Sequence, residues 1–209
     1  MIHYSLPLSE YHASTAISAS KVKAYAKMRC DADYQARYLS GVKQSEPTEA
    51  LAMGQAFEDR CQRGLTEAMQ TLTAANCWGK KPETIQRNIE AASDQIEAMH
   101  AAFEAHPDAE AIRKHGIPQV TFRVEINGVT LQCRPDWYLP NGLDGKSDPR
   151  TVDLKSCQDL HWFPNDIVEY CYHWQAHINR LIIRRALAID AHVDESEVPP
   201  VGLDLFAVD

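Results

Sequence analysis

Several features that would indicate other classes of protein are missing from this sequence of 209 residues. No apolar run approaches the roughly 18 residues that a membrane span needs, so we expect no membrane partner. The first residues lack a basic segment followed by an apolar one, which argues against secretion and predicts a cytoplasmic protein. A glycine-rich phosphate loop is absent, so nucleoside-triphosphate hydrolysis has no support.

Closely spaced metal-binding side chains are also missing. The six cysteines are scattered and form no Cys-x-x-Cys pair, which disfavours structural zinc and iron–sulfur clusters. His173 and His177 have the i, i+4 spacing of a helix face, but no His-Glu-x-x-His pattern surrounds them. A zinc site built on this histidine pair is therefore disfavoured.

Positive charge is scarce, because 21 Lys and Arg residues face 29 Asp and Glu residues, for a net charge of −8. This balance disfavours a broad, non-specific nucleic-acid surface. It still leaves room for a local basic track, especially where metal ions neutralise carboxylates. Length and a hydrophobic content of 44% suit one globular domain.

The periodicity of apolar residues predicts helices in the first half of the chain and a sheet in the second. We expect helices over about 18–29, 31–40, 48–69, 82–106, 108–115 and 165–187, with residues 1–17 extended or irregular. We expect strands over about 120–125, 129–139, 151–157 and 201–208, with Asn127-Gly128 as a hairpin turn. The predicted fold is α/β (α+β), with a central mixed, largely antiparallel sheet flanked by helices. It is organised as one domain with a helical part (18–115), a catalytic sheet and helix (117–187) and a C-terminal strand.

Three charged side chains fall on two consecutive predicted strands. Asp136 lies near the end of strand 129–139. Asp153 and Lys155 are two residues apart on the next strand, so their side chains point to the same face. An isolated Asp-x-Lys is usually a surface ion pair. If the two strands pair, however, the three charges converge on one face of the sheet.

Flanking helices add Glu58, at the edge of an apolar stripe, and Gln175, on an apolar face where its amide needs a partner. A glutamate that merely reaches solvent is the alternative for Glu58. Carboxylate oxygens are the ligands that Mg²⁺ and Mn²⁺ prefer, and clustered acids repel one another without a cation. A nearby lysine stabilises a hydroxide or a phosphate. The set predicts metal-assisted phosphodiester hydrolysis.

In order and spacing these residues resemble the PD-(D/E)XK nuclease superfamily, with its restriction-endonuclease-like core. More narrowly, they resemble the phage recombination exonucleases of the lambda exonuclease and RecE (RecB-type nuclease) group. The matching stretches, within about 18–185, are Met53-Gly54-Gln55-Ala56-Phe57-Glu58, Cys133-Arg134-Pro135-Asp136, Val152-Asp153-Leu154-Lys155 and the helix of Gln175. A glutamate at position 58 favours the lambda type. Asn179 stands where many members carry a tyrosine.

The resemblance implies an exonuclease that digests double-stranded DNA 5′→3′ and leaves 3′ single-stranded overhangs for recombination by strand annealing. Two Mg²⁺ ions per site, replaceable by Mn²⁺, would be bound by Asp136, Asp153, the Leu154 carbonyl and Glu58. Lys155 would orient or activate the attacking water, and Gln175 would position that lysine or the scissile phosphate.

A second group of residues would contact DNA phosphates, although its assignment is weaker than that of the metal ligands. It consists of Ser18, Ser20, Lys21 and Arg134. For the serines, a simple helix cap is the competing interpretation.

Partners follow from the same resemblance: double-stranded DNA ends, a homo-oligomeric ring with a trimer favoured over a tetramer, and a single-strand annealing protein. The host would be a bacterial cell, with the gene carried by a phage or prophage. Two alternatives stay open: a structure- or site-specific endonuclease of the same fold, and a catalytically silent DNA-binding recombination protein.

Overall fold

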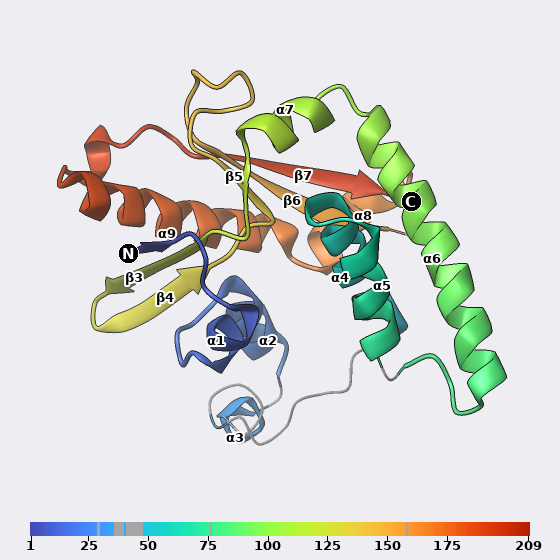
Figure 1. Cartoon of the computed structure of the whole chain (residues 1–209). Coiled ribbons are helices and arrows are strands. Elements are labelled where there is room, and N and C mark those ends of the chain that lie inside the picture. The colour runs from blue at the N-terminus through green and yellow to red at the C-terminus, as the bar shows by residue number, and fades with distance from the viewer. Residues whose placement is uncertain (29, 36–39, 41–47, 76, 158) are drawn as a thin grey trace. The chain divides into compact units, whose positions relative to one another are not determined.

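The computed structural model describes residues 1–28, 30–35, 40, 48–75, 77–157 and 159–209 (Figure 1). The chain divides into two compact units. The first unit consists of Met1–Gln44, His115–Asp153 and Trp162–Asp204; the second consists of Ser45–Lys114, Leu154–His161 and Leu205–Asp209. That they form one nuclease domain stays a prediction. Gly41, where the predicted helix 31–40 should end, lies outside the described residues.

One sheet lies wholly in the first unit, in the order β1 (Ile2–His3), β3 (Thr121–Ile126) and β4 (Val129–Cys133). The antiparallel β3–β4 hairpin turns at Asn127 and Gly128, whose φ angles are 52° and 76°. Positive φ at both central residues is what a type I′ hairpin turn requires, and Asn-Gly supplies it at little cost. The predicted hairpin is therefore confirmed.

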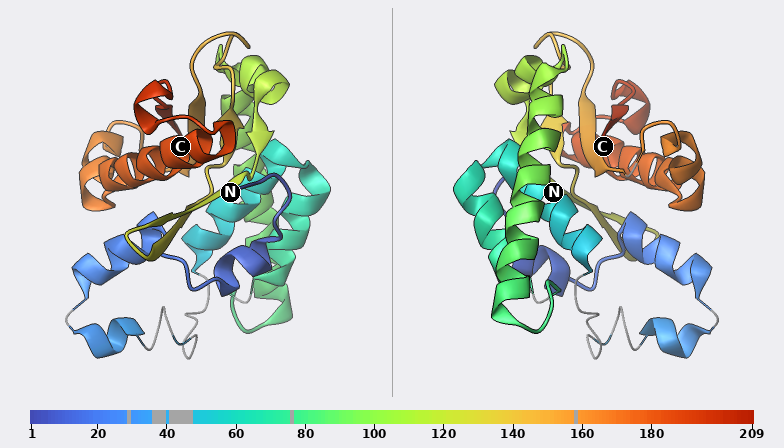
Figure 2. Two further views of the ribbon diagram at one scale, coloured as in Figure 1. Left: turned by 90° about the vertical axis from the view of Figure 1, so that its left-hand side faces the viewer. Right: turned by 90° about the vertical axis from the view of Figure 1, so that its right-hand side faces the viewer.

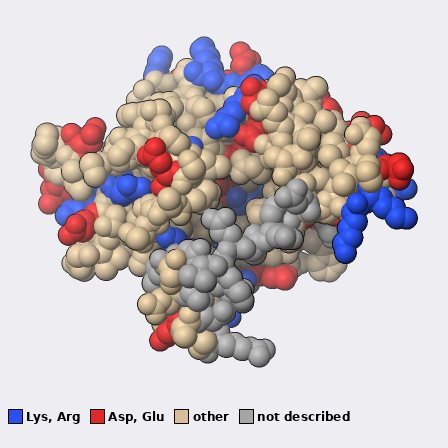
Figure 3. All heavy atoms as spheres, turned by 60° about the horizontal axis from the view of Figure 1, so that its bottom comes forward, with Lys and Arg blue, Asp and Glu red and all other residues tan. Residues whose placement is uncertain are grey.

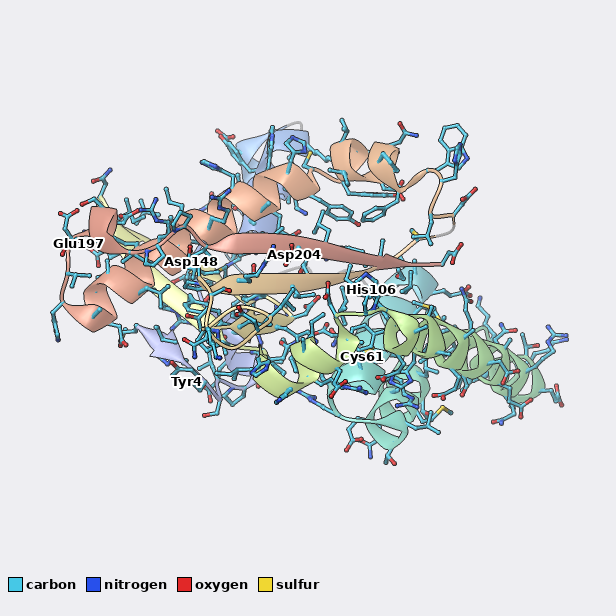
Figure 4. All side chains as sticks on the ribbon, turned by 90° about the horizontal axis from the view of Figure 1, so that it is seen from above. Tyr4, Cys61, His106, Asp148, Glu197 and Asp204 are labelled. Carbon is cyan, nitrogen blue, oxygen red and sulfur yellow. The ribbon has the colours of Figure 1, made fainter. Side chains whose placement is uncertain are left out.

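A second sheet has the order β2 (Ile117–Pro118), β5 (Trp137–Leu139), β6 (Arg150–Ser156) and β7 (Gly202–Val208). β5 pairs antiparallel with β2 and with β6. β7 runs parallel to β6, because the N–H of Gly202 donates to the Pro149 carbonyl and the N–H of Cys157 to the Val208 carbonyl, each at 2.8 Å. The Asp204 carboxylate of β7, labelled in Figure 4, accepts a hydrogen bond from Arg150 of β6. The sheets are mixed and largely antiparallel, as the sequence predicts.

The predicted continuous strand 129–139 is wrong, because it breaks over Arg134-Pro135-Asp136 and its halves join different sheets. Proline has no N–H and cannot donate to the ladder, which favours a break at this point. Opposite the break, between β2 and β3, Gln119 adopts a φ of 56°. Its N–H donates to the Asp136 carbonyl at 3.1 Å, so both strands of the hairpin change sheet at the same level.

The helices described in the first unit are α1 (Leu8–Ala13), α2 (Ala19–Lys27), α3 (Asp31–Tyr34), α8 (Phe163–Glu169) and α9 (Tyr172–Ala191), with a 3₁₀ turn at Glu195–Glu197. The predicted helix 165–187 is in fact two, separated at Cys171, whose φ is 54°. Helix α1 lies where we expected extended or irregular chain, so that prediction is wrong for Leu8–Ala13. α9 packs on β3 and β4, and α2 packs on α9 (Figure 2).

The core of the first unit forms between α9 and the strands. Phe122 and Tyr138 meet edge to face, with ring centroids 5.0 Å apart. Full burial of a side chain such as Phe122 stabilises the fold by about 1.5–3 kcal/mol. The buried members are Val120, Phe122, Val124, Cys133, Tyr138, Ile182, Ile183, Ala186 and Val201.

The second unit holds α4 (Glu49–Gln62), α5 (Leu65–Ala74), α6 (Pro82–Ala105) and most of α7 (Ala109–His115). The predicted helix 48–69 divides at Gly64, whose φ of 115° suits glycine alone. The spacing of Leu51 and Leu65 predicts that both lie on the inward stripe of this helix, which is wrong, since Leu51 is 64% exposed and Leu65 46% exposed. Ala52 and Ala56 are buried instead, which lets α5 and α6 approach α4 closely.

Polar and aromatic contacts tie the helices of the second unit together. Arg60 of α4 forms two hydrogen bonds with the Glu97 carboxylate of α6. Phe206, at the end of β7, contacts the rings of Phe103 and His106, the latter labelled in Figure 4. Among the described helices, none combines the length and apolar character needed to cross a bilayer.

Candidate active site

Two aspartates face each other across the β5–β6 pair. The register pairs Trp137 with Val152 and Tyr138 with Thr151. Continued by one residue, it places Asp136 opposite Asp153. Residues at facing positions of an antiparallel pair point to the same side, with Cβ atoms about 4.5–5.5 Å apart. The prediction that these two strands are neighbours is confirmed.

Asp153 is deeply placed, since only 4% of its surface is exposed, whereas Asp136 is partly buried. Val152 and Leu154, its neighbours in β6, are also buried. This part of the strand is therefore covered on both faces. A buried carboxylate costs free energy unless hydrogen bonds, an ion pair or a metal ion compensate it.

Gln175, on α9, provides one such hydrogen bond. Its Nε2 donates to Oδ2 of Asp153 at 3.1 Å. Its Oε1 accepts from Nζ of Lys23, on α2, at 3.0 Å. The structure thus brings together Gln175 and Asp153, which the sequence singled out, and links them to a lysine that the sequence argument did not select.

Lys23 could have been noticed only as one of several lysines on a predicted helix. It lies four residues before Lys27, whose Nζ donates to the Glu169 carbonyl at 2.8 Å just before α9. Residues at i and i+4 share a helix face, so both lysines turn toward the α8–α9 segment. The separation of 152 residues between Lys23 and Gln175 leaves no local pattern that would predict their contact.

The other predicted site residues, which are the ligands Leu154 and Glu58 and the catalytic Lys155, lie in the second unit. Nζ of Lys155 donates to the Leu154 carbonyl at 3.1 Å. The Glu58 carboxylate accepts from Gln55 and Gln62, one turn before and after it on α4, each at 3.2 Å. The meeting of Glu58 with the two aspartates, which belong to the first unit, stays a prediction.

The donor set suits a hard divalent cation. Asp136, Asp153 and the Leu154 carbonyl offer oxygen atoms only, and Mg²⁺ and Mn²⁺ prefer such ligands with water in the remaining positions. Within the described part of the chain, no three or more His, Cys, Asp or Glu side chains cluster closely enough to hold a metal ion. Binding of one or two ions by these residues and Glu58 stays a prediction.

The residues predicted to contact phosphates have structural partners. Ser18 caps α2, because its Oγ accepts from the Lys21 N–H at 3.4 Å. The Lys21 ammonium donates to the carbonyls of Ser14 (2.9 Å) and Ala16 (2.8 Å), and burial lowers its pKa. Ser20 is exposed at the start of the same helix. Their phosphate-binding role stays a prediction.

Arg134 lies in the strand break. Its guanidinium donates to Oε1 of Gln119 and, at 2.9 Å, to the Leu6 carbonyl, and it lies 5.7 Å from the ring centroid of Tyr11. These contacts fasten the N-terminal segment to the break beside Asp136. Asn179, where the family often has tyrosine, is only 4% exposed, so it is packed into the first unit.

Charges of both signs are interspersed over the face drawn in Figure 3. This distribution agrees with the net charge of −8, and it gives no support to a broad phosphate-binding surface on that face.

Comparison with known proteins adds two findings. Residues 18–193 match the model of a family described as a PDDEXK-like domain of unknown function (DUF3799). The fold is similar to the crystal structure of a protein from Eubacterium rectale titled "Putative exonuclease", with a TM-score of 0.64 and 19% sequence identity over 97% of this chain and 73% of that one. No curated protein matches the chain. The structural neighbour shows that the two proteins share a fold.

Proposed function

This chain belongs to the PDDEXK-like domain family (DUF3799), and we propose that it is a divalent-metal-dependent exonuclease acting on double-stranded DNA. The proposed polarity is 5′→3′, leaving 3′ single-stranded overhangs for recombination by strand annealing. The lambda exonuclease and RecE resemblance of the motifs supports this finer assignment.

The observation that carries the proposal is the pair of facing aspartates on β5 and β6. Asp153 is buried and fixed by the Gln175 amide, and Lys155 follows it by two residues. Two acids that face each other repel unless a cation lies between them, so their placement favours a bound metal ion. A metal beside a lysine suits the cleavage of a phosphodiester, in which negative charge develops on the phosphate oxygens.

In the proposed mechanism Asp136, Asp153 and the Leu154 carbonyl would hold the divalent ion. When bound, such an ion would supply Lewis-acid polarisation of the phosphate and make an attacking water more acidic. The Lys155 ammonium orients the attacking water and stabilises the charge that develops on the phosphate. Glu58 would complete a second metal site.

The test is digestion of linear duplex DNA in Mg²⁺, with each strand labelled in turn at one end. We expect each strand to be shortened from its 5′ end, so that a 5′ label is released before a 3′ label. Asp153→Ala and Lys155→Ala should each lower the digestion rate by at least about 10³-fold, because both side chains act on the transition state. Asp94→Ala, at an exposed position of α6, is the matched control and should keep its activity. Undiminished digestion by either site variant would contradict the mechanism.

Circular duplex DNA separates the two enzymatic alternatives. An exonuclease needs an end and leaves covalently closed circles intact, whereas an endonuclease of the same fold opens them. Binding of duplex DNA without turnover in Mg²⁺ or Mn²⁺ would favour the catalytically silent recombination protein.

We also propose a homo-oligomeric ring, a trimer rather than a tetramer, that encloses the duplex and works beside a single-strand annealing protein. A ring would let an acidic subunit bind DNA, because its cations would line the channel and its acids would face solvent. Light scattering coupled to size-exclusion chromatography measures the assembly mass directly. Three times the subunit mass of 23.5 kDa is expected.

A further inference from the structure

The lysine that contacts Gln175 lies on a helix far away in sequence. Lys23 of α2 donates to Oε1 of Gln175 at 3.0 Å, and its ammonium lies 5.4 Å from the ring centroid of Tyr172, at the start of α9. Lys23 is partly buried against α9. It is therefore held near the amide rather than extended into solvent.

The three polar groups form a chain with one possible direction. An ammonium only donates hydrogen bonds, so the amide must turn its oxygen toward Lys23. The amide NH₂ group then points to Asp153, and an ionised carboxylate only accepts. Rotation of the amide by 180° would set its oxygen against the carboxylate oxygen and its NH₂ group against the ammonium. Both contacts would be repulsive.

We propose that Lys23 is a positioning residue for the nuclease reaction. Its ammonium fixes the orientation of the Gln175 amide, and the amide fixes the Asp153 carboxylate. The inference rests on the proposed function and extends it to a residue outside the acidic motifs. Removal of a side chain that hydrogen-bonds to a metal ligand and orients it commonly lowers metal affinity or activity by about 10–100-fold.

Two other roles for Lys23 make different predictions. A purely structural lysine would only hold α2 against α9, much as Lys27 holds α2 against the end of α8 through the Glu169 carbonyl. A lysine that binds DNA directly would contact a phosphate, and its effect would not depend on Gln175. The proposed role requires Gln175 to be present.

The experiment compares Lys23→Met with Lys27→Met, a change of the same kind on the same face of α2. We expect Lys23→Met to lower kcat on linear duplex DNA with Mg²⁺ by about 10–100-fold, with KM for DNA unchanged. Lys23→Arg, which keeps a donor-only cation, should recover most of the activity, and Lys27→Met should stay close to the wild type. Equal losses for the two Met variants, in step with their melting temperatures, would show a structural role and overturn the proposal.

A double-mutant cycle separates positioning from direct contact with DNA. In a Gln175→Met background, Lys23→Met should cause little further loss, because the amide it orients has gone. Multiplicative losses would show independent action and overturn the proposal. A wild type that cleaves no nucleic acid in Mg²⁺ or Mn²⁺ contradicts the proposed function and the role of Lys23 with it. An active wild type with an equally active Lys23→Met contradicts the role of Lys23 alone.

A metal-free readout is available from the side-chain amide itself. The ¹H–¹⁵N signals of the Gln175 NH₂ group are identified by their loss in Gln175→Met. In Lys23→Met they should move toward the position of solvent-exposed glutamines, while Lys27→Met leaves them in place. Unmoved signals in Lys23→Met would overturn the proposal.

Discussion

Gly54 offers a direct test of how helix α4 lies against β6 within the second unit. It is an interior residue of α4, and a Cβ added to it would lie 3.7 Å from Oγ of Ser156, an ordinary van der Waals distance. Alanine is favoured over glycine in a helix interior by about 0.8–1.0 kcal/mol. Because nothing must move to admit the methyl group, we expect Gly54→Ala to keep most of this gain.

For a chain of this size, a gain of about 1 kcal/mol in the free energy of unfolding raises the melting temperature by about 2–4 °C. Calorimetry with parallel urea denaturation measures both quantities. Gly64→Ala is the matched control and should lower the melting temperature instead. The φ of Gly64 is 115°, where a residue with a side chain is strained, so the change should lower the free energy of unfolding by about 1–3 kcal/mol. A lower melting temperature for Gly54→Ala would refute the packing described for α4 and β6.

The same position links packing to function. Glu58 follows Gly54 by one helical turn and shares its face of α4. A larger side chain, as in Gly54→Leu, meets Ser156 and displaces the helix that carries Glu58. We therefore expect Gly54→Leu to lose nuclease activity while Gly54→Ala keeps it, in the duplex digestion assay.

Three further predictions concern charge and metal. The Arg60 hydrogen bond lowers the pKa of Glu97, so this pair stabilises the protein above the ordinary glutamate pKa of about 4.3 and stops doing so as the pH falls through the lowered value. Because the pair is partly exposed, Arg60→Met should lower the free energy of unfolding by only about 0.5–1 kcal/mol in urea denaturation at pH 7. This difference from wild type should shrink below about pH 4, and a difference that stays constant with pH would contradict the prediction. The Ser147 hydroxyl, with the N–H groups of Lys146 and Ser147, lowers the pKa of Asp144 to about 2, and carboxyl ¹³C titration should show that midpoint rather than one near 4. Mg²⁺ or Mn²⁺ should raise the melting temperature of wild type and leave that of Asp153→Ala unchanged, and chelation should reverse the rise.

Local chemistry made much of the fold predictable. The Asn127-Gly128 turn and the Pro82–Ala105 helix follow from turn residues and periodicity, and both are present. Breaks in long elements were missed. At Gly64 and Cys171 a single residue with positive φ divides what periodicity joins into one helix. A strong apolar period hides such a break, because it continues on both sides.

The candidate site was predictable where it depends on neighbouring strands. The spacing of Asp136 and Asp153 within a strand–loop–strand unit indicated that they could face each other, and the register agrees. The orientation of the helices was less predictable, because tertiary packing decides which face is buried. Trp174 of α9 is 43% exposed although its ring is apolar, and Lys23 was not selected at all.

The strand break at Asp136 bears on the order in which the site is assembled. The hydrogen bond from Gln119 to Asp136 and the pairing of β5 with β6 join residues close in sequence, whereas Lys23 and Gln175 are 152 residues apart. Contacts between near residues close small loops and form quickly, while distant contacts wait for larger loops to close. The two aspartates can therefore meet early in folding, within residues 117–153. The amide and the ammonium join them only after both ends of the first unit have docked, so the folding chain would bring its two aspartates together before it could orient them.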